Sequence, residues 1–366
     1  MARVFMDGFE DGQVAATLIP GAGWNNTLWY WQRAAAGRIG KVTNPVKSGS
    51  YCMRIGTTGS VSSWHQTIER DLGANIKEHY GRIELYSSNG DNNVQENLFL
   101  LDANDDKVAA IRTLRTIGNL VNIYLYLGNT EVACLEEAFA HQTWVRIEWH
   151  LIVDEISGLF ELRRNGDDIL SYSGDTKGAN MESIRTVCLG TYTTARLGEY
   201  IDDFALNDTS GAVNNSWCGP GSILLLKPKG AGNYTQFTPD SGNNFARVNE
   251  IPHTSDSAYV ESATADQIDT YEMQTLTDLG VDTSDPAFNI KAVQHLMAGR
   301  WDEAETKLSR VLRLGTTDNT GAAVALSNTY YRYWDEMFDV NPFDSLAWGL
   351  AGLNSLEAGV KHIAST

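Results

Sequence analysis

Alternation of apolar and polar side chains near the middle of the chain constrains the fold more than any other feature. Over residues 145–153, Val, Ile, Trp, Leu and Val occupy every second position, and Ile152 is the lone apolar residue between them. Successive side chains of a β-strand point to opposite faces, so this period of two predicts a long strand with one face in a core.

A hairpin is predicted directly after this strand. Asn165-Gly166 separates two further strand-like runs, 159–164 and 168–173. A type I′ turn requires positive φ at both of its central positions, and Asn followed by Gly tolerates that conformation. The turn therefore fixes the register of the two strands locally.

The same pattern of short strands and turns extends over the first 208 residues. Further candidate strands lie at 51–55, 62–70, 83–85, 95–102, 107–115, 120–127, 184–189 and 200–206. Short strands at close intervals predict a mostly β fold, an antiparallel β-sandwich or jelly roll, and there is no strand-helix-strand rhythm. The 33 glycines and 15 tyrosines suit this architecture, because Gly supplies positive φ in turns and aromatic rings pack on pleated faces.

Length and local composition divide the chain into two domains. The 366 residues exceed one average domain. The polar, turn-rich run 207–216 is interpreted as the exit from the first domain. We therefore expect a jelly-roll domain over 1–208, a connecting strand and linker over 209–244, and a smaller β-rich interaction domain over 245–366.

The sequence of residues 292–338 fits either helices or strands. Residues 292–314 include Ala-Gly-Arg-Trp-Asp-Glu-Ala-Glu, which fits the paired helices of a tetratricopeptide-type repeat. A single copy of such a repeat cannot bury its apolar face, and no second copy follows. We therefore favour strands at 290–298, 306–315 and 328–338.

The pattern changes once more after Pro342. Asp344 or Ser345 can serve as N-cap of a terminal amphipathic helix, which would close the second core or dock on a neighbouring subunit. The apolar residues at helical spacing are Leu346, Leu350, Leu353, Leu356 and Val360.

Charge and composition exclude several partners. The formal net charge of -18 repels a phosphate backbone, so nucleic acid is not expected to bind. No run approaches the roughly 20 apolar residues of a membrane span, and the residues after Met1 do not form a signal peptide. We expect synthesis in the cytoplasm and no membrane partner. Four distant cysteines without a Cys-x-x-Cys pair predict free, mostly buried thiols in place of a zinc site: Cys52, Cys134, Cys188 and Cys218.

The sequence contains none of the catalytic motifs that we compared with it. Jelly-roll glycanases carry carboxylates in a Glu-x-Asp-x-x-Glu-like arrangement, whereas Glu69, Asp71 and Glu161 are interpreted as solvated strand-edge charges. The histidines are dispersed, including His65 and His150, and there is no nucleophile elbow or phosphate-binding loop. We therefore expect no enzymatic activity, no catalytic residue and no cofactor.

Two ligand sites stay open as alternatives to purely structural roles. The loop Asp102-Ala-Asn-Asp-Asp106 offers oxygen ligands to calcium, but it lacks the Gly and distal Glu of an EF-hand and is equally a polar turn between strands. The densest aromatic cluster either stacks on sugars in lectin fashion or belongs to the core, and its members are Trp24, Trp29, Tyr30 and Trp31.

Several segments resemble a known family in the same order along the chain. Phe5-Met-Asp-Gly-Phe-Glu-Asp11 and the aspartate-pair segment 198–211 are similar to the opening and closing strands of concanavalin A-like, laminin-G-type jelly rolls found in phage particles. The segment 217–228 is similar to their connecting strand. Asn341-Pro-Phe with Trp348 resembles their terminal motif, although Phe-Asp-Ser follows Pro342 where the family commonly has Pro-x-Thr-Gly.

This resemblance implies a structural component of a bacteriophage virion, such as a capsid decoration, tail or fibre-type protein. Such a protein contacts other virion proteins and copies of itself, and symmetric oligomers are expected because identical patches are repeated in a particle. The alternative function is a lectin-like module that binds host-surface glycans.

Overall fold

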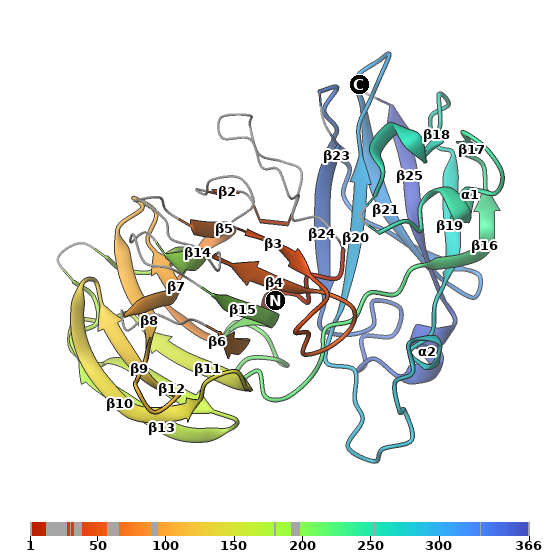
Figure 1. The fold of residues 1–366 in the computed structure, drawn as a ribbon. Helices are drawn as coiled ribbons and strands as arrows, with labels where there is room; N and C mark the ends of the chain where they lie inside the picture. The colour runs from red at the N-terminus through yellow and green to blue at the C-terminus, as the bar shows by residue number, and fades with distance from the viewer. Residues whose placement is uncertain are drawn as a thin grey trace. The chain divides into compact units, whose positions relative to one another are not determined.

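The computed structural model describes residues 2–11, 28–29, 31–32, 39–56, 66–88, 94–178, 181–191, 198–251, 253–329 and 331–364. In these ranges the chain forms antiparallel sheets, and the helical elements are limited to α1 (Asn244–Arg247), α2 (Leu350–Asn354) and two short 3-10 turns (Figure 1). The prediction of a mostly β fold is confirmed. None of the helices in the described ranges is long and apolar enough to cross a membrane.

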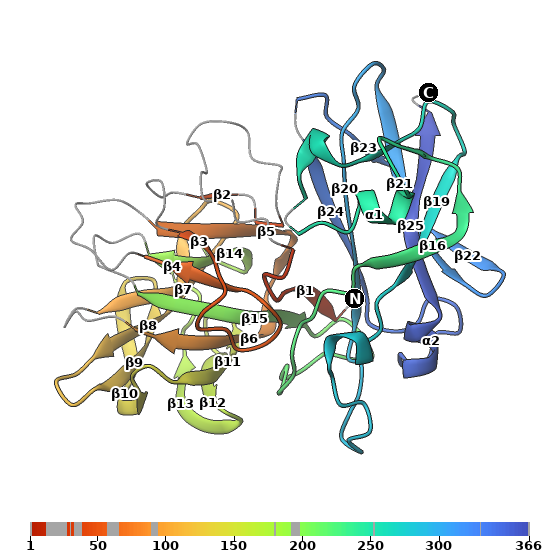
Figure 2. The same cartoon turned by 45° about the vertical axis from the view of Figure 1, so that its right-hand side comes forward.

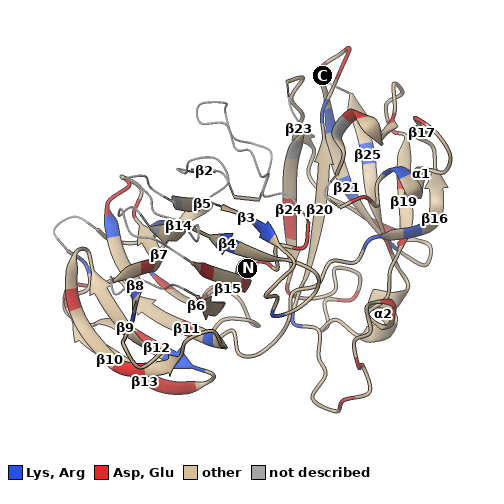
Figure 3. Ribbon diagram, in the orientation of Figure 1, with Lys and Arg blue, Asp and Glu red and all other residues tan. Residues whose placement is uncertain are grey.

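The chain divides into two compact units near Leu224. This division lies inside the segment 209–244 that the sequence suggested as a linker. Acidic and basic residues are spread along the strands and loops of both units (Figure 3).

The larger unit is a sandwich of two sheets (Figure 2). The eight-stranded sheet, here called sheet A, has the order β13 (Asp167–Gly174), β12 (Gly158–Arg164), β11 (Trp144–Ile152), β6 (Glu78–Ser87), β15 (Glu199–Asp208), β4 (Cys52–Ile55) and β3 (Ile39–Val42), and β1 (Arg3–Asp7) pairs with β15. The seven-stranded sheet, called sheet B, has the order β10 (Thr130–Ala140), β9 (Leu120–Leu127), β8 (Lys107–Arg115), β7 (Gln95–Leu101), β14 (Ile184–Thr191), β5 (Gln66–Ile76) and β2 (Trp31–Gln32).

Alternate residues of the two sheets form the core of the sandwich. In β11 the side chains of Ile147, Trp149 and Leu151 are fully buried, as the alternation predicted. Glu148 and His150 on the opposite face are also buried, with 1% and 7% exposure. A sheet with one side in water does not have a second buried face, so other residues must cover this side of β11.

The predicted hairpin is confirmed. β12 pairs with β13, and the two residues between them have the positive φ of the expected turn, 54° at Asn165 and 101° at Gly166. None of the four cysteines, all of which the structure describes, forms a disulfide, as expected; Cys134 is exposed and the other three are buried.

The smaller unit is also β-rich. Its six-stranded sheet has the order β16 (Pro228–Thr235), β19 (Ile268–Met273), β25 (Leu356–Ala364), β21 (Thr306–Leu314) and β22 (Thr317–Thr320), and β23 (Val324–Ala325) pairs with β21. Two strand pairs complete it, β17 (Thr238–Pro239) with β18 (Val260–Glu261) and β20 (Val293–Gly299) with β24 (Arg332–Phe338). The preference for strands in residues 292–338 is therefore confirmed.

The prediction of a terminal helix that starts after Asp344 or Ser345 and reaches Val360 is wrong outside Leu350–Asn354, where Gly349 is the N-cap. The helix is confined to α2, and residues from Leu356 onward form β25, which pairs with β19 on one side and β21 on the other. Gly359 lies against its neighbour strand so closely that a Cβ there would lie 1.9 Å from the carbonyl oxygen of Asp269. Pairing on both sides in a sheet outweighs the helical spacing of the leucines, because propensity is a weak local effect.

Candidate functional site

The buried outer side of sheet A, called here the polar face, is the most unusual feature of the larger unit. Cross-strand pairing places its side chains in rows across β11, β6 and β15. The rows contain Trp144, Tyr86 and Tyr200; Arg146, Glu84 and Asp202; Glu148 and Arg82; and His150 and Tyr80.

The first of these rows is aromatic. The ring centroids of Trp144 and Tyr86 lie 5.4 Å apart at 53°, and those of Tyr86 and Tyr200 lie 5.6 Å apart at 89°. All three side chains are half-buried. Because the rings meet at tilted and edge angles, they do not stack face to face with one another. We call these three residues the aromatic row.

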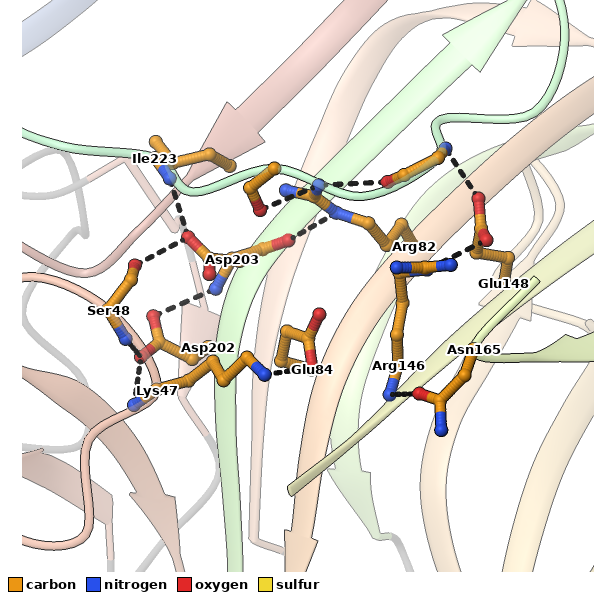
Figure 4. A network of polar contacts seen from close by, with 12 residues as sticks. Lys47, Ser48, Arg82, Glu84, Arg146, Glu148, Asn165, Asp202, Asp203 and Ile223 are labelled. Atoms are coloured by element: carbon orange, nitrogen blue, oxygen red, sulfur yellow. Dashed lines mark hydrogen bonds and ion pairs between the residues drawn. The ribbon is translucent and has the colours of Figure 1, made fainter. Parts of the chain in front are cut away.

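The next row is charged and ties a loop to the sheet (Figure 4). The carboxylate of Asp202 accepts hydrogen bonds from the backbone N–H groups of Lys47 at 3.0 Å and Ser48 at 3.3 Å. The ammonium group of Lys47 lies 3.6 Å from Glu84. Asp202 is fully buried, and burial together with the neighbouring charge of Asp203 raises its pKa to about 8.

A β-bulge places the second aspartate of the pair next to this row. The register between β15 and β6 shifts between Asp202 and Ala205, and Asp203 has a φ of 49°. Its carboxylate accepts hydrogen bonds from the hydroxyl of Ser48 at 3.0 Å and the backbone N–H of Ile223 at 2.6 Å. Burial raises the pKa of Asp203. The bulge thus re-aims one side chain toward two separate segments.

Arg82 and Glu148 hold the segment that follows the last strand of the sandwich (Figure 4). Arg82 Nη1 donates to the carbonyl oxygens of Gly219 at 3.1 Å and Gly221 at 2.9 Å. Glu148 accepts hydrogen bonds from the backbone N–H of Gly219 at 2.6 Å and from Arg146 at 2.9 Å. These contacts explain why Glu148 is buried, and they close this half of the polar face.

A histidine lies between two carboxylates further along the same face. His150 is stacked on Tyr80, with ring centroids 4.0 Å apart at 9°. Its Nε2 lies 3.0 Å from Glu78 and its Nδ1 lies 3.2 Å from Glu161. Glu161 therefore has a specific partner, so it is not the isolated solvated charge that the sequence suggested.

The other acidic residues of that prediction differ from each other. Glu69 is 6% exposed, and its carboxylate accepts a hydrogen bond from the Thr67 hydroxyl at 3.2 Å, so the solvated interpretation is wrong for Glu69. Asp71 pairs with Arg185 at 2.5 Å near the surface.

The aromatic cluster predicted from the sequence is not the aromatic row. Trp29 is 5% exposed, and its indole N–H donates to Asp7 at 2.8 Å. Its ring centroid lies 5.4 Å from that of Phe5 and 5.3 Å from that of Phe204. Its ring belongs to the core. Trp24 and Tyr30 lie outside the described residues, as does His65, and only the backbone of Trp31 is described, in β2.

The loop suggested as a calcium site forms hydrogen bonds within itself. Asp102 Oδ1 accepts hydrogen bonds from the backbone N–H groups of Asn104 at 2.8 Å and Asp106 at 2.9 Å. Within the described ranges, no group of three or more His, Cys, Asp and Glu side chains is arranged to hold a metal ion.

One sequence signal pointed to the aromatic row. In each of the three strands, alternation assigns one set of positions to the core, and Tyr86, Trp144 and Tyr200 occupy the other set. A large aromatic side chain at a position assigned to solvent is the informative observation, and it recurs in three strands. Clustering along the chain, which selected Trp24 to Trp31, is a weaker criterion.

Comparison with known proteins finds similarity only to solved structures of low identity. No family model and no curated protein matches the chain. Among solved structures, the endo-β-1,4-glucuronan lyase of Trichoderma reesei is 14% identical, with a TM-score of 0.38 over 57% of this chain and 96% of that one. A carbohydrate esterase of Shiga toxin-encoding bacteriophage phi24B is 14% identical, with a TM-score of 0.40 over 58% and 99%. Lectin II of Ulex europaeus is 10% identical, with a TM-score of 0.32 over 50% and 96%.

These similarities concern the fold alone. They also correct the prediction that the chain has no enzymatic activity. A glucuronan lyase, an alginate lyase and a carbohydrate esterase are among the solved structures to which the chain is similar. Since one fold hosts many functions, the absence of familiar motifs in the sequence does not exclude catalysis.

Proposed function

We propose that the larger unit is a glycan-binding module and that the aromatic row is its contact surface. The observation that carries this proposal is the position of Trp144, Tyr86 and Tyr200 in one cross-strand row, half-buried and not stacked on each other. Sugar rings present flat apolar faces of C–H groups, which pack on aromatic rings. Tyr and Trp combine an apolar ring with a polar group, so they suit a surface where one side is apolar and the other is in contact with water.

The charged row beside the aromatic row supplies polar groups for orientation. Arg146 and Glu84 lie next to Trp144 and Tyr86 on the same strands, two residues along. Two residues of a strand span roughly 6.6 Å, which is the scale of one sugar ring. Ligand sites commonly combine apolar surface with a few placed polar groups, and these two rows provide both.

Binding to a glycan array, followed by fluorescence titration of the best ligand, tests this function. We expect Trp144→Ala to weaken binding at least tenfold. Tyr172→Ala is the matched control, because Tyr172 is half-buried in β13, away from the row. An array without any bound glycan, or equal affinity of the two variants, contradicts the proposal.

A location in a phage particle is a second proposal, and it is supported by the ordered sequence resemblance. Its specific structural counterpart is the segment after β15, which resembles the connecting strand of that family in sequence, is not a strand between residues 217 and 227, and is the segment that Arg82 and Glu148 hold. In this proposal the protein is a decoration or tail component that contacts other virion proteins and its own copies. Mass spectrometry of purified particles tests it, and particles without this polypeptide would exclude it.

A further inference from the structure

The outer side of sheet B carries a second polar cluster, distinct from the aromatic row. Glu96 on β7 is 1% exposed, and two cations of β8 converge on one of its oxygens. Lys107 Nζ lies 2.6 Å and Arg112 Nη2 lies 2.9 Å from Glu96 Oε1. Each cation also lies over an aromatic ring, Lys107 over Phe99 and Arg112 over Tyr126, at 5.1 Å and 3.9 Å from the ring centroids.

The second oxygen of this carboxylate is the unusual feature. Glu96 Oε2 is buried and has no hydrogen-bond partner among the described residues. The next residue, Asn97, is 1% exposed, and neither its side-chain oxygen nor its nitrogen has a partner in the described part of the chain. A buried polar atom without a partner costs about 1–3 kcal/mol, so three of them in two consecutive residues call for an explanation.

The backbone is specialised at the same place. The register between β7 and β8 shifts between Glu96 and Leu98, which makes Asn97 the extra residue of a β-bulge. Bulges concentrate next to functional sites, where they re-aim side chains. A bulge together with buried, unpaired polar atoms at one position is typical of a site that is organised for a ligand.

We propose that Glu96 and Asn97 form the centre of a second ligand site, which takes a saccharide bearing a carboxylate. Lys107 and Arg112 share one oxygen of Glu96, so one of these cations can pair with a ligand carboxylate while the other stays on Glu96. A ligand carboxylate draws Lys107 and Arg112 toward itself, and their long side chains move readily. Glu96 Oε2 and the Asn97 amide then bind the neighbouring sugar hydroxyls, as acceptors and as a donor.

This site goes beyond the aromatic row and does not depend on it. The two lie on different sheets, with no residue in common. A substitution in one is therefore expected to leave ligand binding at the other unchanged, and this separates the failure of one proposal from the failure of the other.

The test is calorimetric titration with a galacturonate tetramer and with its methyl ester, which has the same hydroxyls without the charges. We expect the acid to bind at least tenfold more tightly than the ester. Asn97→Ala should lower the affinity for the acid at least tenfold, whereas Trp144→Ala should not change it. Equal binding of acid and ester, or no binding of either, overturns the proposal.

A stability measurement on the same variant distinguishes a ligand-binding residue from a structural one. Because the Asn97 side chain has no partner in the described structure, Asn97→Ala removes buried polar atoms without breaking a hydrogen bond. The melting temperature of Asn97→Ala should equal or exceed that of the parent protein. A clear drop in melting temperature would show a structural role and would overturn the assignment. Glu96→Gln, which keeps the shape and removes the negative charge, should increase the preference for the acid over the ester, because Lys107 and Arg112 then face the ligand carboxylate without a competing anion.

Discussion

The buried carboxylate of Glu148 accepts a hydrogen bond of 2.6 Å from the backbone N–H of Gly219, a residue 71 positions further along the chain. The same carboxylate accepts from Arg146 on its own strand. One side chain thus joins the middle of sheet A to the segment that leaves the sandwich. The polar face is closed at this end by hydrogen bonds, and it keeps its half-buried aromatic row at the other.

Glu148→Ala should therefore lower the free energy of unfolding by about 2–4 kcal/mol, because it leaves a buried N–H and a cation without their partner. Urea denaturation followed by tryptophan fluorescence measures the change. Glu182→Gln is the control: its side chain is 78% exposed and pairs with Lys177, so we expect a change within about 0.5 kcal/mol. Equal stability of the two variants would contradict the structural role of Glu148.

Gly81 of β6 gives a second stability prediction. A Cβ at this position would lie 1.9 Å from the buried ring of Trp149. Gly81→Ala should lower stability by about 2–3 kcal/mol, since the ring and the strand must shift to admit one methyl group. Gly40→Ala is the matched control on β3 of the same sheet, where a Cβ meets nothing within 4 Å. If Gly40→Ala has the lower melting temperature of the two variants, the ring of Trp149 does not pack against Gly81 in this way.

Glu199 makes the stability of the larger unit depend on pH. Its side chain is 1% exposed, and burial raises the pKa of this carboxyl to about 8. The unfolded chain ionises near the ordinary value of 4.5, so between about pH 4.5 and 8 the folded state holds a proton that the unfolded state has lost. The stability from this group is fully present below about pH 4.5 and is lost as the pH rises toward 8.

Glu199→Gln should remove this dependence. The variant should become more stable relative to the parent protein as the pH rises, by about a factor of ten in the folding equilibrium for each pH unit within that window. Denaturation curves at pH 5, 6, 7 and 8 give the difference directly, and other titrating groups cancel in it. A difference that stays constant with pH would show that Glu199 is ionised in the folded protein.

Cysteine reactivity checks the burial of the sandwich. We expect one thiol per chain to react rapidly with a maleimide in the native state, because Cys134 is exposed and the other three are buried. Partial desolvation, together with the nearby carboxylates of Glu131 and Glu136, raises the pKa of Cys134, so the rate should increase with pH, as the thiolate is the reactive form. Cys134→Ser should abolish the rapid phase, and rapid labelling of that variant would contradict the fold at Cys52, Cys188 or Cys218.

Local geometry explains which features the sequence alone determined. The alternation at 145–153 and the Asn165-Gly166 turn act through neighbouring residues, since side-chain direction and φ are local properties. Both are present in the structure as predicted. A different argument predicted the strands at 306–315 and 328–338: a single helical repeat could not bury its apolar face.

Long-range pairing decided the rest. The leucines before Val360 have helical spacing, but β25 lies between β19 and β21 and gains hydrogen bonds on both edges. In the same way Tyr86, Trp144 and Tyr200 are far apart in the chain and meet because the sheet order places β6 between β11 and β15. Alternation determined which face each of these side chains occupies, whereas only the order of strands, which depends on contacts between distant segments, decided that the three lie in one row.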